Sequence, residues 1–504
     1  MTADLLLRTL AFAGYFIILA YIGWRAYQRT TDIEDFILGG RRIGSWVAAL
    51  SAGASDMSGW LMMGLPGLAY ASGFESIWLA LGLLVGTWLN WRLLARRLRV
   101  FSQAYGNALT LPEFLANRFQ DHGGWLRILA ALFILIFFLL YTSAGLVAGG
   151  KLFEAVFGLP YVWAVAAGTL AILLYTSLGG FLAVAWTDVF QGLLMAAALI
   201  IVPLVALDQL GGPTAALTQL QALNPALLDP FTAGNGQPLG FIAILSLAAW
   251  GLGYFGQPHI LARFQAIRSP EAVPQARRIA VGWSLLTMAG AILTGLVGVL
   301  LLDSPLLGDE REKVFIQLVN LLFHPLVAGI LLAAILAAIM STADSQLLVT
   351  SATFTEDFYR RLLAREATPG HQVIAGRLAV VAVACLAFLL ALDPRAHVLD
   401  LVAHAWAGFG ATFGPVLLVA VYWSGMTWRG ALAGMLTGGL VVIAWPPLLG
   451  DLFALYEIVP GFLLSLIAIW LVSRFGGGPR GELAVEFNRI ARQLSPTDVV
   501  IPSR

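Results

Sequence analysis

One aspartate, Asp56, lies in the middle of a stretch that is otherwise apolar enough to cross a lipid bilayer. The stretch reads SAGASDMSGWLMMGLPG over residues 51–67, and Ser51, Ser55 and Ser58 share one helical face. A carboxylate near mid-membrane costs at least about 2.5 kcal/mol, so a cation, free backbone amides or water must compensate it. The glycines weaken the helix here, which predicts a partly unwound segment with exposed carbonyl oxygens, although close helix packing would also explain them.

A second stretch carries the same kind of interruption. AAWGLGYFGQPHI, residues 248–260, contains three glycines and Pro258, which removes a backbone donor and clashes with the preceding turn. Each of the two interrupted stretches is followed by four further apolar spans. This layout is typical of secondary transporters built from two inverted repeats, with the binding site at the bilayer midplane.

The third candidate is LAAIMSTADSQ, residues 336–346, where Ser341 and Thr342 place adjacent hydroxyls deep in an apolar span and Asp344 follows. Hydroxyl and carbonyl oxygens are hard ligands, which suit alkali and alkaline-earth cations better than zinc or copper. Serine and threonine also bond back to their own helix, and that interpretation stays open for the pair taken alone. Beside an unwound helix at Asp56, the pair predicts a cation site between two membrane segments.

Membrane helices must carry these stretches. Of the 504 residues, 59% are hydrophobic and only 11% are charged, which is too little charge to cover a soluble protein. Thirteen apolar runs of about 20 residues predict an all-α integral membrane protein, with centres near residues 14, 58, 84, 140, 168, 198, 248, 290, 333, 383, 412, 440 and 465. We expect span 1 in 1–30, spans 2–6 in 31–208, an external loop and spans 7–11 in 209–425, spans 12 and 13 in 426–475, and a cytoplasmic tail in 476–504.

The basic residues set the expected orientation. With the N-terminus outside, all but five of the 29 Lys and Arg residues fall in cytoplasmic segments. The five on the outer side are Arg8, Lys151, Arg311, Lys313 and Arg395. This asymmetry favours an outer N-terminus and an inner C-terminus.

The tail carries one helical stripe, formed by Leu483, Phe487, Ile490 and Leu494. An amphipathic stripe beside arginines predicts a short helix that lies on the inner leaflet. An unstructured chain end is the equally open alternative.

Six blocks of the chain together resemble the sodium/solute symporter family, and within it the bacterial members that transport proline. Besides the three stretches above, they are NALTLPEFLANRF (107–119), GGFLAVAWTD (179–188) and AWAGFGATFGPV (405–416), and the likeness extends from about Asp35 to Pro460. The resemblance implies a LeuT-type 5+5 inverted repeat, made of spans 2–6 and 7–11 with broken helices 2 and 7. It also implies sodium-coupled solute uptake through the bacterial cytoplasmic membrane.

The resemblance further implies the site residues, position by position. Sodium would be held by oxygens of Ala54, Met57, Ala338, Ser341 and Thr342. Asp56, with Ser55 beside it, matches an aspartate needed for sodium-dependent function, and Asp188 matches an acidic residue on the inward sodium path. The L-proline pocket would comprise Ser58, Gly59, Trp60, Tyr141, Trp250, Tyr254 and Pro258. Asp344 departs from the family pattern, in which a small hydroxyl residue follows the Ser–Thr pair, and this carboxylate could change cation affinity or permit proton coupling.

The pocket also makes chemical sense for proline, a zwitterion with a compact apolar ring. Aromatic rings could enclose that ring while their N–H and O–H groups address its charged ends. The alternatives are the same fold with pantothenate, another amino acid or a short carboxylate as substrate, a transporter-like membrane sensor, and a channel. We expect no enzyme, because no metal-spaced His/Glu cluster, nucleophile elbow or phosphate loop is present. Nor do we expect a nucleic-acid or obligatory protein partner.

Overall fold

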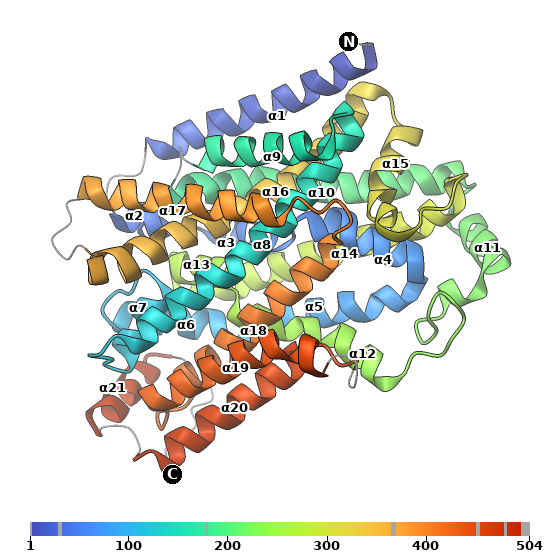
Figure 1. The fold of residues 1–504 in the computed structure, drawn as a ribbon. Coiled ribbons are helices and arrows are strands. Elements are labelled where there is room, and N and C mark those ends of the chain that lie inside the picture. The colour runs from blue at the N-terminus through green and yellow to red at the C-terminus, as the bar shows by residue number, and fades with distance from the viewer. Residues whose placement is uncertain are drawn as a thin grey trace.

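The computed structural model describes residues 3–28, 33–176, 180–363, 369–449, 454–477 and 481–494. In these ranges the protein is built from helices that run side by side across the molecule (Figure 1). Nine of the described helices are long and apolar enough to cross a membrane, and one bent pair would make a tenth. Two shorter apolar helices cover 161–173 and 374–390, so helices surround every predicted span centre.

The first half of the chain contains α1 (Ala3–Tyr27), α2 (Ile33–Leu38), α3 (Ser45–Asp56), α4 (Leu65–Ser72), α5 (Ile77–Leu89), α6 (Arg96–Ala104), α7 (Leu111–Arg118), α8 (Trp125–Phe157), α9 (Tyr161–Thr176) and α10 (Phe181–Gln209). The second half contains α11 (Pro213–Leu223), α12 (Phe241–Ala248), α13 (Pro258–Ala266), α14 (Val273–Leu301), α15 (Val314–Leu322), α16 (Pro325–Thr353), α17 (Pro369–Leu390), α18 (Val398–Tyr422), α19 (Trp428–Leu449), α20 (Ile458–Phe475) and α21 (Gly481–Ala491). Shorter 3-10 and π-helical turns connect several of them.

Both predicted breaks are present. Helix α3 ends at Asp56, Met57 leaves helical geometry with φ −87° and ψ 76°, and a π-helical turn at Trp60–Gly64 leads into α4. Helix α12 passes into a 3-10 segment, Ala249–Gly256, and the chain then bends by 48° before α13 begins at Pro258. Proline at the first position of α13 needs no backbone donor there, so it starts the new helix without a lost hydrogen bond.

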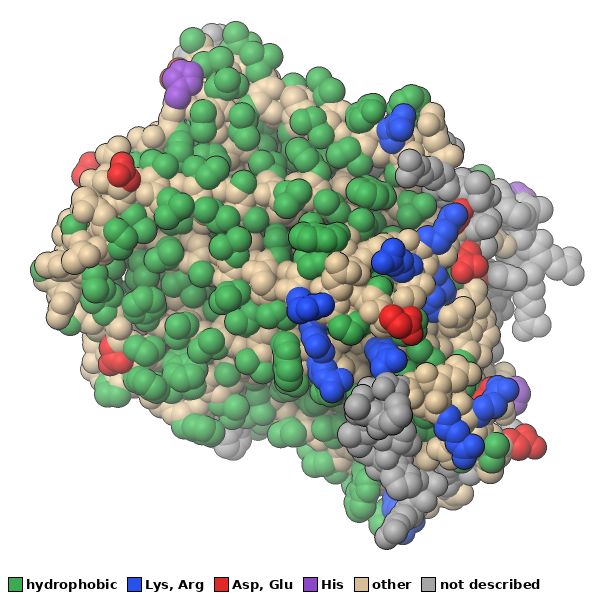
Figure 2. Space-filling view, turned by 180° about the vertical axis from the view of Figure 1, so that it is seen from behind, with side chains coloured by type: hydrophobic (Ala, Val, Ile, Leu, Met, Phe, Trp, Pro, Cys, Tyr) green, Lys and Arg blue, Asp and Glu red, His purple; other side chains and the backbone are tan. Residues whose placement is uncertain are grey.

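The two ends of the helix array differ in charge. Helix α1 begins at the end of the molecule opposite to α21 (Figure 1). From behind, Lys and Arg side chains gather toward one end, beside a broad hydrophobic belt (Figure 2). Several basic residues that were counted as loop charges are instead buried in the protein, and among the described ones these are Arg41, Arg97, Arg99, Arg118, Lys151 and Arg263.

The tail forms the predicted helix, but its apolar stripe does not face lipid. Leu483, Phe487, Ile490 and Leu494 are all buried. Phe487 packs on Phe101 of α6 with ring centroids 5.1 Å apart, and the Arg118 guanidinium lies 4.8 Å from the centre of the Phe487 ring. The prediction of a helix on the inner leaflet is therefore wrong, because protein rather than membrane covers this face.

Candidate functional site

The break in α3 meets the middle of α16. The hydroxyl of Ser341 donates to the carbonyl oxygen of Ala54 at 2.7 Å and to that of Ala338 at 3.1 Å. The second bond is the expected back-bonding within a helix, whereas the first joins two helices. Next along α16, the hydroxyl of Thr342 is buried with no hydrogen-bond partner among the described residues. Four of the five predicted sodium-binding residues thus lie at one helix crossing.

The fifth residue, Met57, occupies the break itself. Its sulfur accepts a hydrogen bond from the Thr287 hydroxyl at 3.6 Å. Ser55, two residues earlier, donates to the carbonyl of Ala52 at 3.2 Å, which is back-bonding within α3. Neither contact places an oxygen of these residues at the crossing.

Asp56 links the two broken helices. Its Oδ2 accepts a hydrogen bond from the Tyr254 hydroxyl at 2.5 Å. Its backbone carbonyl accepts from Trp60 Nε1 at 3.1 Å and from the Tyr141 hydroxyl at 3.3 Å. Its Oδ1 is buried without a donor in the described part of the chain. One hydroxyl offsets little of the cost of burying a carboxylate, so this oxygen offers an acceptor to a cation.

Aromatic rings from four segments surround this point. The rings of Trp60 and Trp250 lie 6.5 Å apart, and the Tyr254 ring meets Trp406 edge to face at 5.0 Å. Trp406 also donates from Nε1 to the carbonyl of Trp250 at 2.7 Å, which ties α18 to the second break. The structure therefore brings the predicted Trp60, Tyr141, Trp250 and Tyr254 together and adds Trp406, which the AWAGFG block contained without a stated role.

The remaining predicted pocket residues contribute in other ways. A Cβ on Gly59 would lie 2.6 Å from that of Ala148, so this glycine permits close packing of the break against α8. Ser58 is buried at the break. Pro258, the first residue of α13, lines a small cavity at the second break.

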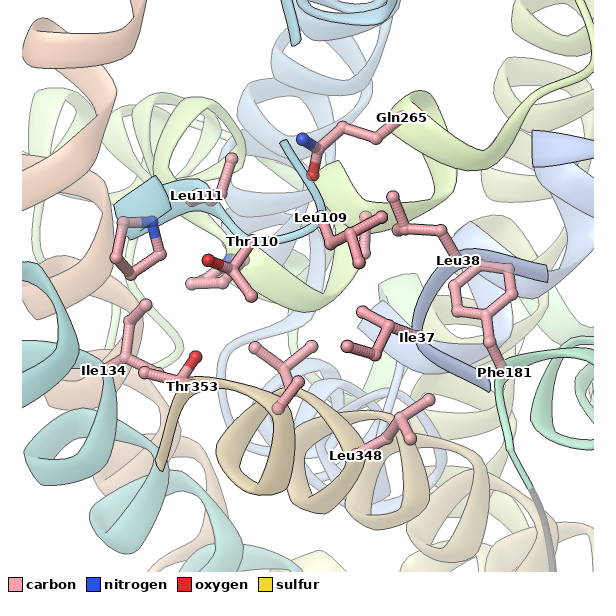
Figure 3. Close-up of a pocket in the computed structure, with 15 residues that line it drawn as sticks. Ile37, Leu38, Leu109, Thr110, Leu111, Ile134, Phe181, Gln265, Leu348 and Thr353 are labelled. Carbon is pink, nitrogen blue, oxygen red and sulfur yellow. The ribbon is translucent and has the colours of Figure 1, made fainter. Parts of the chain in front are cut away.

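Two cavities approach the second break from opposite sides. The larger one, of about 430 Å³, reaches Trp250 and Tyr456, whose rings stack at 5.5 Å. The smaller one, of about 20 Å³, reaches Pro258. In the close-up of this smaller cavity, Leu109 and Thr110 face Leu348 of α16 across the opening (Figure 3).

Asp188 forms a buried ion pair that the sequence did not predict. Its Oδ2 lies 2.9 Å from Nη2 of Arg263 and accepts from the Ser51 hydroxyl at 2.7 Å, and both charged side chains are fully buried. Arg263 further donates to Ser51 at 3.0 Å, to the carbonyl of His259 at 2.8 Å and to Ser345 at 2.5 Å. An arginine in HILARF, directly after the second break, was the available signal for this partner.

Solved structures with the same fold come from membrane transporters. A Na+-coupled sialic acid symporter in a substrate-bound outward-open state superposes with a TM-score of 0.76 at 17% identity, covering 94% of this chain and 99% of that one. Mhp1, a nucleobase-cation-symport-1 family transporter in a closed conformation, gives 0.54 at 16% identity, covering 92% and 100%. At these identities the likeness concerns the fold alone.

Sequence relatives are much closer. The osmoregulated proline transporter OpuE of Bacillus subtilis is 48% identical over 461 residues, which is 91% of this chain and 93% of the relative. The sodium/proline symporter of Staphylococcus aureus is 45% identical over 489 residues, covering 95% and 94%. The model of the Sodium:solute symporter family matches residues 36–438. The chain belongs to the sodium:solute symporter family, a family of membrane transporters and not of enzymes.

Proposed function

We propose that this protein imports L-proline together with sodium by alternating access. The names of its relatives, a proline transporter and a sodium/proline symporter, support this substrate pair. Sodium is the co-transported ion and not a resident cofactor. The host membrane is the bacterial cytoplasmic membrane.

The contact between Ala54 and Ser341 is the observation that carries the sodium site. A carbonyl at the open end of α3 and a hydroxyl of α16 lie 2.7 Å apart, with the Thr342 hydroxyl, which has no partner in the described part of the chain, beside them. Neutral oxygens from two helices suit an alkali cation, which prefers hard ligands. In place of the Ser341 hydrogen bond, a sodium ion would link the two helices and hold the broken helix against α16. Met57 and Ala338 would supply further carbonyl oxygens to it.

Proline would bind next to this ion, among the aromatic rings. Trp60, Tyr141, Trp250 and Tyr254 can enclose its apolar ring. The backbone amides at the broken-helix ends favour its carboxylate. Ser58, Gly59 and Pro258 complete the pocket in this proposal. The unpaired oxygen of Asp56 lies at the junction of ion and substrate and adds negative potential for the cation.

Alternating access needs two halves that move around this site. We assign spans 2–6 (31–208) and spans 7–11 (209–425) to the two inverted repeats, with span 1 (1–30), spans 12 and 13 (426–475) and the tail (476–504) outside them. Thirteen crossings put the N-terminus outside and the C-terminus inside. Supporting this, α1 begins opposite to α21 and the basic side chains gather at one end.

The inward step would pass the buried Asp188–Arg263 pair, which lies between α10 and α13. Because proline is neutral overall, each sodium carries one net charge inward. A membrane potential of 100 mV then supplies about 2.3 kcal/mol, enough for roughly 50-fold accumulation before any sodium gradient acts.

Uptake of radiolabelled proline into proteoliposomes tests the proposal. We expect uptake to require an inward sodium gradient and to collapse in Asp56→Asn, whereas Asp208→Asn, at an exposed position, serves as the matched control and should transport normally. Unchanged uptake after sodium is replaced by potassium would contradict the coupling. A competition panel with pantothenate, other amino acids and short carboxylates separates proline from the alternative substrates.

A further inference from the structure

A groove opens on the outer surface of the helix array where α1, α3 and α10 meet. It has a volume of about 600 Å³ and is lined by Tyr21, Ile22, Arg25, Ala26, Arg42, Ile43, Gly44, Val47, Leu182 and Trp186. We call it the α1–α3–α10 groove. It is separate from the cation and substrate site, since none of the predicted site residues lines it.

The charge of the groove is positive. Arg25 and Arg42 line it, and among the residues that the structure describes no acidic one does. Arg42 pairs with Asp35, but its side chain remains 61% exposed while that of Asp35 is 5% exposed. A guanidinium has five N–H donors, so this pair leaves several of them directed outward. Arg25 is exposed and has no ion pair within the described residues.

The rest of the lining is suited to a lipid. Val47 and Leu182 give the groove an apolar wall. Tyr21 and Trp186 are 59% and 45% exposed on its rim, and such aromatic side chains gather where the acyl region meets the headgroups. Arginine binds phosphate oxygens in a bidentate manner. The groove therefore combines an anion-binding end with an apolar path, which a free inorganic ion would not need.

We propose that the α1–α3–α10 groove binds an anionic phospholipid, with its phosphate between Arg25 and Arg42 and an acyl chain along the apolar wall. Basic pockets between membrane helices on the cytoplasmic side bind anionic headgroups in this way. The placement in the inner leaflet rests on the orientation proposed above, whereas binding itself does not. Such a lipid would bridge α1 to the two helices that carry Asp56 and Asp188.

Lipid retention by the purified full-length protein tests this. The protein is incubated with mixed detergent micelles that contain phosphatidylglycerol or phosphatidylcholine, and bound lipid is counted by native mass spectrometry. We expect the protein to retain phosphatidylglycerol in preference to phosphatidylcholine. Binding of phosphatidylglycerol should weaken about fivefold for each arginine removed, first in Arg25→Gln and then in the double variant that also carries Arg42→Gln. Arg474→Gln, an exposed arginine at the end of α20, is the matched control and should retain the lipid.

Each other outcome contradicts the proposal. Equal retention of both lipids, unchanged retention in Arg25→Gln, an equal loss in Arg474→Gln, or full displacement by excess inorganic phosphate would each overturn it. Arg25→Gln is decisive if the double variant fails to fold, because Arg25 makes no ion pair with any described residue, whereas losing Arg42 removes the ion pair of the buried Asp35. Proline uptake is not the readout, so failure of the proposed transport function would leave this result unaffected.

Discussion

Removing either member of the Asp188–Arg263 pair should destabilise the protein. Both side chains are fully buried, so Asp188→Asn leaves an uncompensated guanidinium and Arg263→Gln leaves an uncompensated carboxylate. Breaking a buried pair in this way typically costs about 3–5 kcal/mol. If all 504 residues unfold together, an unfolding entropy of about 2.1 cal/mol/K per residue converts this cost into a Tm lower by about 3–5 °C.

The double variant is the sharper measurement. In the double variant both charges are removed, so no uncompensated charge remains buried at this position. We therefore expect its Tm to lie no lower than that of the worse single variant. Thermal unfolding of all variants in one detergent, followed by intrinsic fluorescence, measures this. Asp208→Asn, at an exposed position near the end of α10, is the control and should leave Tm unchanged. Strictly additive losses in the double variant would refute the idea that the two charges compensate each other.

Three further predictions concern the site. Ser341→Ala removes a hydroxyl from the helix crossing and should raise the sodium concentration for half-maximal uptake about tenfold, on the order of one charge-assisted bond; an unchanged value would exclude Ser341 as a ligand. Tyr254→Phe deletes the hydrogen bond to Asp56 and should lower the initial rate of proline uptake at limiting sodium. An unaltered initial rate would show that Tyr254 contributes only to packing. Gly251→Ala should abolish uptake, because its Cβ would overlap the Gly82 carbonyl. Gly282→Ala is the control and should transport normally, because its Cβ would face open space. Normal uptake by Gly251→Ala would argue against close packing of the second break on α5.

The sequence was most informative where lipid restricts the backbone. In hydrocarbon every amide needs an internal partner, so glycine and proline inside an apolar span have few explanations. The breaks at Met57 and Gln257 follow from that rule. The contact of Ser341 with Ala54 could not be derived in the same way, since spacing alone does not say which face of α16 meets α3. It came from the resemblance.

Long-range pairing of charges was beyond the sequence. Asp188 and Arg263 lie on α10 and α13; the arginine after the second break signals a buried cation, but its local sequence does not say which carboxylate it meets. Lys151 is a second case, since it was counted as an outer loop charge but is buried in α8. Its Nζ lies 2.7 Å from a carboxylate oxygen of Glu312 and donates to the carbonyl of Ala396. A rule that counts basic residues by position treats all of them as solvated, although a buried partner can hold them inside the protein.

The two breaks are held by different forces, and this difference indicates where sodium can act. At the second break, a Cβ on Gly251, Gly253 or Gly256 would overlap α5 or α18, so this segment is fixed by close backbone packing and must move with those helices. At the first break, Gly59 packs closely on α8, but the polar contacts to α8, α16 and the second break are single hydrogen bonds, each of about 1 kcal/mol. An ion that exchanges a few such bonds can shift the balance between two arrangements, because a ligand shifts an equilibrium only by its differential affinity. In the proposed mechanism, sodium would therefore act most effectively at the crossing of α3 and α16, and the packed second break would transmit the resulting motion to the two cavities beside it.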